Sequence, residues 1–509
     1  YDVILEGNNK ITKDLKLNYQ LGAIYTDNVS DNVSNVASGL LVANKFSINF
    51  GTKPTVSSGG SEVEKQSVFG QMNLGYKDAI FLNGSVRNDW DSRLPSPHSY
   101  AYYSAGISGV LSELFTFPDF MSFLKVGVDY AEVGNGGQFG LLNVTYGYQN
   151  GVGPGYLARS STFPIPGLKP EIVQNTEASI EAGFLKNRLN FTFTYYRSNA
   201  INQLLTIGIP AATGFSSQYI NAGNIQNQGV EVVLSAKPVV NGNFNWNIDF
   251  NLGINKNKVV SLSDNLDIVY LRGYYDFGGR EQIAVGGSFN DISGYGWARN
   301  ATGQLLVDAN GKPITDMAAG NDPKVFGDFN PAATLGLSNS FAYKRFSLRM
   351  LVDGRVGGII VDGTEMNLSF SGLTKPTLEH RDGGWDLGGV DKDGHPVSST
   401  ISASDFWQTV SSKRNGNGEF YVYDATNFRV RELSLGYSIP LQPNFFIKSA
   451  NFSLVARNLF WLYRGKSKLD IPGLKKRKLE FDPDMTVNGV VYGQFPSTRS
   501  IGFNLSLTF

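Results

Sequence analysis

Aromatic side chains are concentrated in three stretches that the sequence pattern places in loops. Flat aromatic faces stack on sugar rings or pack against peptide side chains, and neighbouring Asn, Asp and Arg residues supply orienting hydrogen bonds. The substrate-contact candidates are Tyr156, Tyr274, Tyr275, Trp297, Trp385 and Trp407. The same rings could instead pack the loops on one another or against a partner protein, because aromatic residues are also enriched at interfaces. The residue types therefore indicate binding of a bulky ligand and leave the packing alternative open.

Residue combinations suited to catalysis are scarce. The three histidines, His98, His380 and His395, all fall in predicted loops, and no zinc-protease helix or nucleophile-elbow motif is found. His380 and His395 could be imagined as a metal or acid–base cluster, but one weak match lacks the geometry that such a site needs. We therefore predict no catalytic residues, no metal and no cofactor, and we regard a hydrolase as the least favoured class.

Two short stretches resemble fragments of calcium-binding loops. They are residues 308–311 (Asp-Ala-Asn-Gly) and residues 391–394 (Asp-Lys-Asp-Gly). The distal bidentate glutamate that a calcium loop needs is absent at the required spacing in both. Asp-Gly and Asn-Gly sequences are typical of tight turns, and turns are the preferred interpretation.

The charge balance excludes several kinds of partner. Lys plus Arg equals Asp plus Glu, 44 against 44, so no global field favours nucleic acid. A local basic run at residues 475–478 (Lys-Lys-Arg-Lys) is therefore interpreted as a solvated or lipopolysaccharide-facing loop. The chain has no cysteine, which excludes disulfides, thiol catalysis and cysteine-based metal sites.

The elements that must position these loops are alternating strands. From Phe244 to Asn255, every second residue is apolar and the residues between are polar, directly after an Asn-Gly hairpin signal at 241–242. Strands of soluble sandwiches are usually about 5–6 residues long, whereas these reach ten or more. Hydrophobic residues make up 41% of the chain, without a run long enough for a transmembrane helix. The pattern favours membrane contact through strands.

The last strand has the same alternation and ends on an aromatic residue. Ile501, Phe503, Leu505, Leu507 and Phe509 are apolar, and the residues between them are small or polar. This stretch is close to the roughly 9–11 residues that a tilted strand needs to cross a bilayer. We assign Phe503, Leu505, Leu507 and Phe509 to a C-terminal strand that takes part in barrel assembly.

About fifteen strands are predicted, and their connections alternate between tight and long. Tight connections are expected at residues 77–78, 186–188, 241–242, 344–345 and 441–450, and long ones at approximately 133–173, 199–227, 256–332, 356–426 and 464–497; residues 26–65 also read as a long polar stretch. Short periplasmic turns and long extracellular loops are typical of transmembrane barrels. The predicted fold class is all-β, a transmembrane antiparallel β-barrel.

Several stretches resemble the SusC/RagA-type TonB-dependent transporters of the Bacteroidetes outer membrane. They are Arg87-Asn88-Asp89-Trp90-Asp91-Ser92-Arg93-Leu94, Gly167-Leu168-Lys169-Pro170-Glu171, Asn187-Arg188-Leu189, Asn227-Gln228-Gly229-Val230-Glu231, Asn255-Lys256-Asn257-Lys258-Val259, residues 429–437 from Arg429 to Tyr437, Ala456-Arg457-Asn458-Leu459-Phe460, Phe481-Asp482-Pro483-Asp484 and Pro496-Ser497-Thr498-Arg499-Ser500. Each is short, but together they follow one order along nearly the whole chain.

The resemblance implies a 22-stranded barrel with an N-terminal plug, of which residues 1–509 would be the C-terminal part. It implies outer-membrane localisation and active import of a glycan, oligosaccharide or oligopeptide. The implied partners are TonB, acting through a plug region that these residues lack, and a SusD-like lipoprotein at the extracellular face, besides outer-membrane lipid. We expect upstream polypeptide to pair with the first strand and with 503–509. A passive porin or an adhesin barrel without energy coupling is the alternative.

Overall fold

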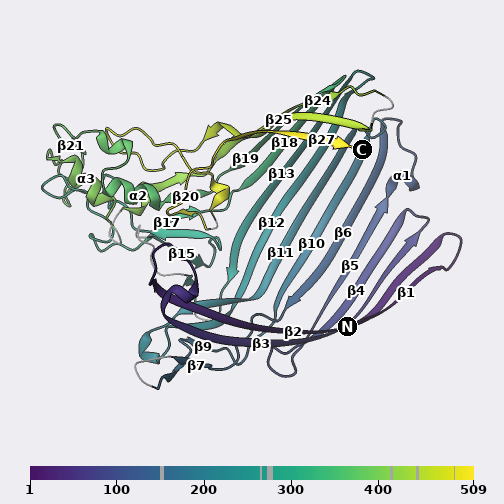
Figure 1. Cartoon of the computed structure of the whole chain (residues 1–509), viewed down its shortest axis with the longest axis horizontal. Helices are drawn as coiled ribbons and strands as arrows, with labels where there is room; N and C mark the ends of the chain where they lie inside the picture. The colour runs from purple at the N-terminus through teal and green to yellow at the C-terminus, as the bar shows by residue number, and fades with distance from the viewer. Residues whose placement is uncertain (150–153, 264–265, 272–278, 413–416, 443–445, 487) are drawn as a thin grey trace. The chain divides into compact units, whose positions relative to one another are not determined.

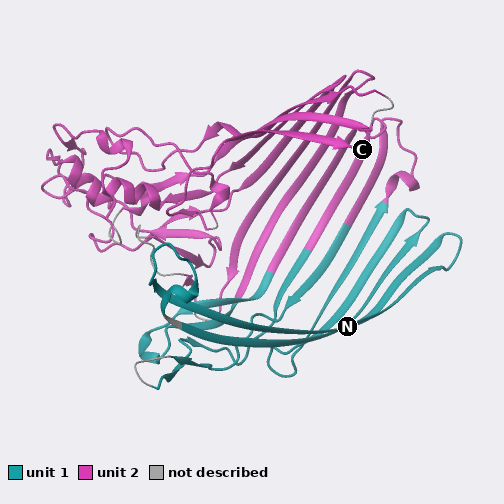
Figure 2. Ribbon diagram, in the orientation of Figure 1, with its two compact units in different colours: residues 1–109, 128–175, 200–222 teal, residues 110–127, 176–199, 223–509 magenta. Residues whose placement is uncertain are grey.

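The computed structural model describes residues 1–509 except 150–153, 264–265, 272–278, 413–416, 443–445 and 487, and except the side chains of residues 53 and 54. The chain divides into two compact units (Figure 2). Unit 1 comprises residues 1–109, 128–175 and 200–222, and unit 2 comprises residues 110–127, 176–199 and 223–509. Strands β6, β10, β11 and β12 each run through both units.

Unit 1 begins with five long strands that follow one another as antiparallel neighbours. The strands of this unit, with those it shares, are β1 (Asp2–Lys10), β2 (Leu15–Leu40), β3 (Gly51–Tyr76), β4 (Ile80–Asp91), β5 (Ser99–Val110), β6 (Met121–Asn135), β7 (Tyr146–Gln149), β8 (Tyr156–Arg159) and β9 (Thr162–Phe163). Cross-strand registers separate two faces. Leu17, Leu74, Leu82 and Ile107 form an apolar row, and Asn18, Asn73 and Asn83 form a polar row on the opposite face.

Unit 2 continues the same construction with longer loops (Figure 1). Its sheet strands, with those it shares, are β10 (Glu171–Phe184), β11 (Leu189–Gly208), β12 (Ser217–Val240), β13 (Phe244–Ser261), β18 (Ala333–Tyr343), β19 (Phe346–Val356), β24 (Asn427–Ile439), β25 (Ser449–Arg464) and β27 (Ser500–Thr508). The short helix α1 (Leu111–Leu114) precedes β6. Leu348, Leu435, Leu454 and Phe503 form an apolar row across β19, β24, β25 and β27. Their side chains are exposed by 38%, 49%, 50% and 75%, so this row has no protein layer over it.

Among the described residues the main sheet has 16 strands, of which fifteen follow one another and β9 pairs only with β12. The predicted number of about fifteen strands is confirmed. The tight connections also lie where the sequence places them, for example between β10 and β11 and between β18 and β19. No described helix has the length and apolar character needed to cross a membrane.

Two predicted connections differ from the structure. The stretch 26–65 is largely strand, because β2 and β3 pair from Leu15↔Tyr76 out to Leu40↔Gly51. Valine and threonine recur in this polar stretch and favour extended backbone, and the two strands satisfy each other's hydrogen bonds. The expected loop 199–227 is reduced to residues 209–216, because β11 and β12 extend into it. The other long connections span residues 136–170, 262–332, 357–426 and 465–499.

Segments of the last three long connections fold together into a loop module, which we define as the described residues within 279–329, 359–425 and 465–491. Its elements, with the neighbouring strand β14, are β14 (Ile268–Tyr270), β15 (Gly279–Ala284), β16 (Asp291–Gly294), β17 (Lys324–Asp328), β20 (Ile359–Asp362), α2 (Gly363–Phe370), β21 (Trp385–Asp386), β22 (Thr400–Ile401), α3 (Ala403–Val410), β23 (Val422–Asp424) and β26 (Val490–Val491). Figure 1 shows β15, β17, β20, α2, β21 and α3 gathered beyond the ends of β18 and β19.

Candidate functional site

The loop module has a hydrophobic core of its own, built mostly from aromatic rings. Trp297, Trp385, Phe406, Trp407 and Phe420 are at most 2% exposed and belong to one cluster of buried residues. Trp407 meets Phe406 and Phe420 edge to face, with ring centroids 5.2 and 5.6 Å apart. The indole Nε1 atoms of Trp297 and Trp385 donate to the carbonyls of Leu306 and Pro472, at 2.8 and 3.0 Å. Rings from distant loops thereby hold the module together.

The structure describes four of the six substrate-contact candidates, and it places them in three different settings. Trp297 and Trp385 are buried in the module core, which corresponds to the packing alternative that the sequence left open. Tyr156 starts β8 in unit 1 and is 61% exposed. Tyr274 and Tyr275 lie outside the described residues. Trp407 is buried and also lines a cavity. Substrate contact by these residues stays a prediction.

The cavity beside Trp407 has a volume of about 660 Å³ and lies between the end of α2 and the start of α3. Its lining includes Arg381, Gln408 and the hydroxyl residues Ser369, Thr377, Ser402 and Ser404. The Arg381 guanidinium donates to the carbonyls of Thr377 (2.8 Å) and Gly372 (3.1 Å). Within the described part of the chain this guanidinium has no carboxylate partner within ion-pair distance. The cavity can therefore offer donors and hydroxyls to a polar ligand beside an aromatic wall.

A buried ionisable network joins α2 to the last long connection. Arg477 pairs with Glu365 at 2.7 Å, and the hydroxyl of Tyr423 donates to the same carboxylate. Burial, with the nearby Glu365 charge, raises the pKa of Asp362 to about 7. The Asp362 carboxylate accepts from the Glu365 amide at 2.7 Å and so caps α2.

Arg477 belongs to the basic run that the sequence placed in a solvated loop, and for this one residue the interpretation is wrong. Its side chain is 8% exposed, and the guanidinium lies 4.0 Å from the centroid of the Phe420 ring. A buried acid and a stacked ring take the place of water around the cation. Lys475, Lys476 and Lys478 are exposed, as the sequence predicts.

A second network fixes the last long connection to the strands. Arg429 and Arg431 on β24 both contact Asp482, at 2.6 and 2.8 Å, and Arg431 also pairs with Asp353 on β19. The register shifts between β24 and both of its neighbours around Arg431. This bulge moves Arg431 off the face of Leu433 and Leu435 and brings it beside Arg429. Ion pairs therefore hold loop residues 482–484 against the polar face of the sheet.

The polar face of unit 1 offers a different surface, made mostly of neutral amides and hydroxyls together with the carboxylate of Glu6. A cavity of about 620 Å³ is lined by Glu6, Asn18, Gln20, Gln71, Asn73, Asn83 and Ser85, among others. Gln20 donates to Glu6 at 2.5 Å, and Gln71 donates to Gln20. The hydroxyl oxygens of Ser85 and Ser104 lie 2.7 Å apart, within hydrogen-bond distance. Amides and hydroxyls of this kind suit a wall along which a hydrophilic solute exchanges hydrogen bonds with water and protein.

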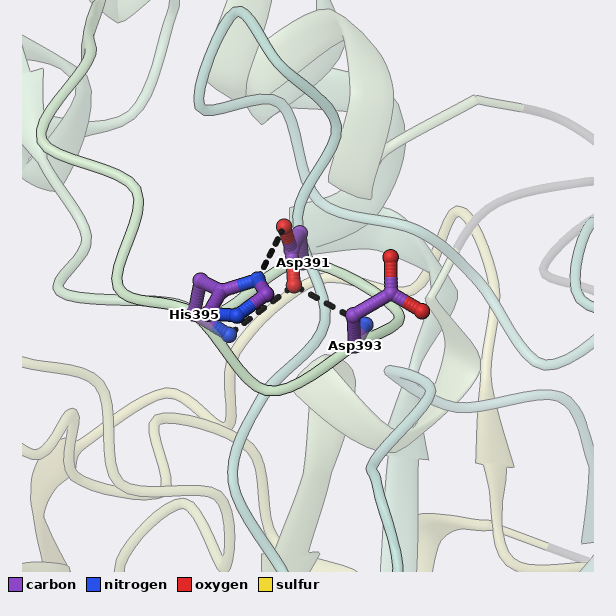
Figure 3. A group of neighbouring side chains, drawn as sticks. All are labelled: Asp391, Asp393 and His395. Atoms are coloured by element: carbon purple, nitrogen blue, oxygen red, sulfur yellow. Dashed lines mark hydrogen bonds and ion pairs between the residues drawn. The ribbon is translucent and has the colours of Figure 1, made fainter.

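The possible metal group consists of Asp391, Asp393 and His395 in an exposed turn (Figure 3). One oxygen of Asp391 already accepts from the amides of Asp393 and His395, both at 2.9 Å, and the other lies 3.3 Å from the His395 ring. These donors, the His395 amide first, lower the pKa of Asp391. The oxygen of Asp308 makes the same pair of amide contacts with Asn310 and Lys312. Both segments form the turns that the sequence predicts, and His380 stacks on Trp385 instead of joining this group.

Two features were missed in the sequence, and the sequence carries a signal for only the first of them. Asp362 with Glu365, and Ser402 with Asp405, have the three-residue spacing of helix N-terminal caps. The stretches 429–437 and 481–484 both carry the family resemblance, but nothing in either of them shows that they contact each other. Only the fold brings Arg429 and Asp482 together.

Comparison with known proteins gives one family. The model of the family described as TonB dependent receptor-like, beta-barrel matches residues 4–459. The TonB-dependent receptor P3 of Formosa agariphila is 25% identical over 491 residues, which cover 88% of this chain and 46% of that protein. The TonB-dependent receptor SusC of Bacteroides thetaiotaomicron is 25% identical over 287 residues, which cover 53% of this chain and 26% of that protein.

A solved structure of the RagAB peptide transporter aligns over 100% of this chain and 55% of its own, with a TM-score of 0.77 and 20% identity. Its closed-closed state gives a TM-score of 0.75 with 21% identity. At these identities the likeness concerns the fold. The chain spans about half the length of the curated relatives P3 and P26 of Formosa agariphila.

Proposed function

This chain belongs to the TonB-dependent receptor-like β-barrel family, whose members are outer-membrane proteins, and we propose that it imports a bulky hydrophilic nutrient across the outer membrane. The proposed cargo is a glycan, oligosaccharide or oligopeptide, and the proposed energy source is TonB acting on a plug region. In this proposal residues 1–509 supply the C-terminal part of the barrel wall and the long extracellular loops.

The observation that supports import is the separation of the wall into two faces. One face carries uncovered apolar rows such as Leu348, Leu435, Leu454 and Phe503, which suit hydrocarbon. The other carries amides, hydroxyls and the network of Arg429, Arg431 and Asp482, which suit water and a polar cargo. The family is one of transporters, and its members use such a wall to enclose a lumen.

We further propose that a SusD-like lipoprotein covers the extracellular face and that the loop module is the part of this chain that receives it. The module is suited to this task because it is prefolded around its own core. The cavity of Trp407, Arg381 and Gln408 would be the first contact for cargo within the module. The likeness to SusC and RagAB supports this pairing. RagAB is described as a peptide transporter, but at 20% identity its cargo does not decide between a glycan and a peptide for this chain.

Uptake in intact cells tests the proposal with the full-length protein. Labelled oligopeptides and labelled oligosaccharides are offered separately to cells that contain or lack the gene, with and without a protonophore, and in cells without TonB. Import predicts uptake of one of the two probes that is lost in each of the three deficient conditions. Uptake that survives the protonophore and the loss of TonB would instead identify a passive porin, and surface binding without uptake would identify an adhesin.

A paired substitution examines the cavity beside Trp407. Gln408→Ala changes an exposed lining side chain that has no place in the module core. It should raise the cargo concentration needed for half-maximal uptake while the protein's amount in the membrane stays the same. Lys392→Ala, in the exposed turn 391–394, serves as the control. Equal behaviour of the two variants would remove the cavity from the cargo path.

A further inference from the structure

On two strands of unit 2, β11 and β13, basic side chains continue the row of apolar side chains. The two strands lie on either side of β12. On β13 the apolar alternation Trp246, Ile248, Phe250, Leu252 and Ile254 continues in register as Lys256 and Lys258. On β11 the alternation that ends in Tyr195, which is 44% exposed, continues as Arg197. Gln226 lies between them: it is paired with Lys258, and its carboxamide lies 2.8 and 2.9 Å from two nitrogens of the Arg197 guanidinium. All three cations are exposed.

A third group of cations lies on the hairpin formed by residues 465–479, which starts where β25 ends. Burial alternates strictly from residue 465 to residue 471, so that Ser467, Leu469 and Ile471 are buried while Lys466 and Lys468 are exposed. On the returning limb Lys478 is exposed and Leu479 is buried. Lys466 and Lys478 form an isolated antiparallel β-bridge, so they lie directly opposite each other. Like charges placed in this way destabilise a sheet.

The fold does not neutralise these lysines. In the segment 464–480, Arg464 pairs with Glu480, Lys476 with Asp470, and Arg477 with the buried Glu365. Over the described residues, no carboxylate lies within ion-pair distance of Lys466 or Lys478. The chain as a whole carries no net charge, so this local excess is not a consequence of general basicity.

One cavity connects the hairpin to the end of the apolar face. It has a volume of about 590 Å³ and is lined by both Lys256 and Lys468, together with Val356. Val356 is 40% exposed and ends the apolar row Ile254–Ala333–Val356. Asp328 and Asp424 also line the cavity, but their oxygens accept hydrogen bonds from Ser288 and Asn330 and from Thr426. The lysines thus lie just beyond the side that meets hydrocarbon.

We propose that Arg197, Lys256, Lys258, Lys466, Lys468 and Lys478 form a basic belt that binds the phosphate groups of outer-leaflet lipid. The inference relies on the proposed function only for the outer-membrane setting. A position immediately past the apolar rows is the headgroup level of a bilayer, where Lys and Arg contact phosphates. Lysine suits this role because its flexible stem delivers a point charge to phosphates at variable positions.

Binding of lipid A to the purified full-length protein tests the belt. The protein is titrated in detergent with bis-phosphorylated lipid A and, separately, with the phosphate-free lipid, and bound lipid is counted by native mass spectrometry. The triple variant Lys466→Gln, Lys468→Gln, Lys478→Gln should lose roughly tenfold to a hundredfold in affinity for the phosphorylated lipid, with no change for the phosphate-free one. The matched control, Lys186→Gln, Lys344→Gln, Lys448→Gln, removes three exposed lysines near the short turns and should keep wild-type affinity.

A folding defect is not expected in the triple variant, because removing like charges that face each other should leave its melting temperature unchanged or raise it. Equal affinity of the triple variant and the wild type for phosphorylated lipid A would overturn the proposal. The lysines would then be solvated side chains without a lipid ligand. If the triple variant instead loses binding of polygalacturonate oligomers and keeps lipid A, the surface serves an acidic glycan and the lipid assignment fails. Neither outcome changes the TonB-dependent uptake assay, so failure of the belt and failure of the import proposal remain distinguishable.

Discussion

The sheet wall of unit 2 and the loop module use the same residue types for opposite purposes. On the wall, Phe503 is 75% exposed and Leu454 is 50% exposed, and no protein covers them. In the module, Phe406 is fully buried and Trp297 is enclosed by neighbours. The wall can leave its apolar face uncovered because hydrocarbon is its solvent, whereas the module stands in water and must bury its rings. Whether an aromatic residue of this chain should be exposed or buried therefore depends on whether hydrocarbon or water surrounds that part of the molecule.

The largest expected effect comes from opening the module core. Phe406→Ala removes a ring that contacts Trp385, Trp407 and Phe420, and it should cost the module about 3–5 kcal/mol because the cavity cannot collapse. Hydrogen exchange on the full-length protein in a membrane measures this as faster exchange in residues 359–425, with β13 and β18 unchanged. Phe250→Ala on β13 is the control, since lipid fills the space that it leaves. Faster exchange spread equally over strands and module would show that the two regions are one cooperative unit.

A smaller effect distinguishes the two faces of the wall. Phe250 and Asn251 are neighbours on β13 with side chains on opposite faces. Phe250→Lys places a charge in hydrocarbon and should destabilise the barrel by roughly 2–4 kcal/mol, whereas Asn251→Lys meets the wet face and should cost far less. Urea unfolding of the full-length protein from vesicles compares the two variants. Equal losses would contradict the assignment of the faces.

The smallest effect, counted for each pH unit, is a pH dependence confined to the module. Because the pKa of Asp362 is raised to about 7 from its ordinary value near 3.9, the folded module keeps a proton that the unfolded one has released. Stability should therefore fall as pH rises from about 4 to about 7, by at most about 1.4 kcal/mol per pH unit, and level off above. The protection of the amides of residues 363–370 against exchange, followed from about pH 4 to about pH 7 and then above pH 7, measures the slope and the plateau.

Asp362→Asn should remove this slope, because an asparagine still accepts the Glu365 amide but does not titrate. Asp391→Asn in the exposed turn is the control, and it should keep the wild-type slope in residues 363–370. A slope that persists in Asp362→Asn would assign the pH dependence to another group.

The wall was predictable because its pattern is local. Alternation from Phe244 to Asn255 and the tight turns give strand positions and faces without knowledge of any partner. The strand count and the barrel class follow from the same signal repeated along the chain. The extension of β2 and β3 into residues 26–65 was missed because this stretch is polar and shows no apolar alternation. Only the pairing of the two strands with each other identifies it as β-structure.

The module was not predictable in this way. Its core joins residues far apart in the sequence, such as Trp297, Phe406 and Ile471, and no periodicity connects them. Aromatic residues in long loops therefore left both ligand contact and packing open, and Trp297 and Trp385 pack. The contact of Arg429 with Asp482 depends on a bulge at Arg431, which has no signature in the sequence. The capping residues Asp362 and Ser402 could be recognised from the sequence, but they indicate only where a helix begins.

The way the module collects its core also sets an order of events during biogenesis. Ile292 precedes the β18–β19 hairpin, Phe406 lies between that hairpin and the next, and Val490 follows β25. Contacts so distant along the chain form late, after the loops between them are closed. Closure of the module is thus a natural marker that the last hairpins are in place, and a conformation-specific antibody against it would count finished molecules.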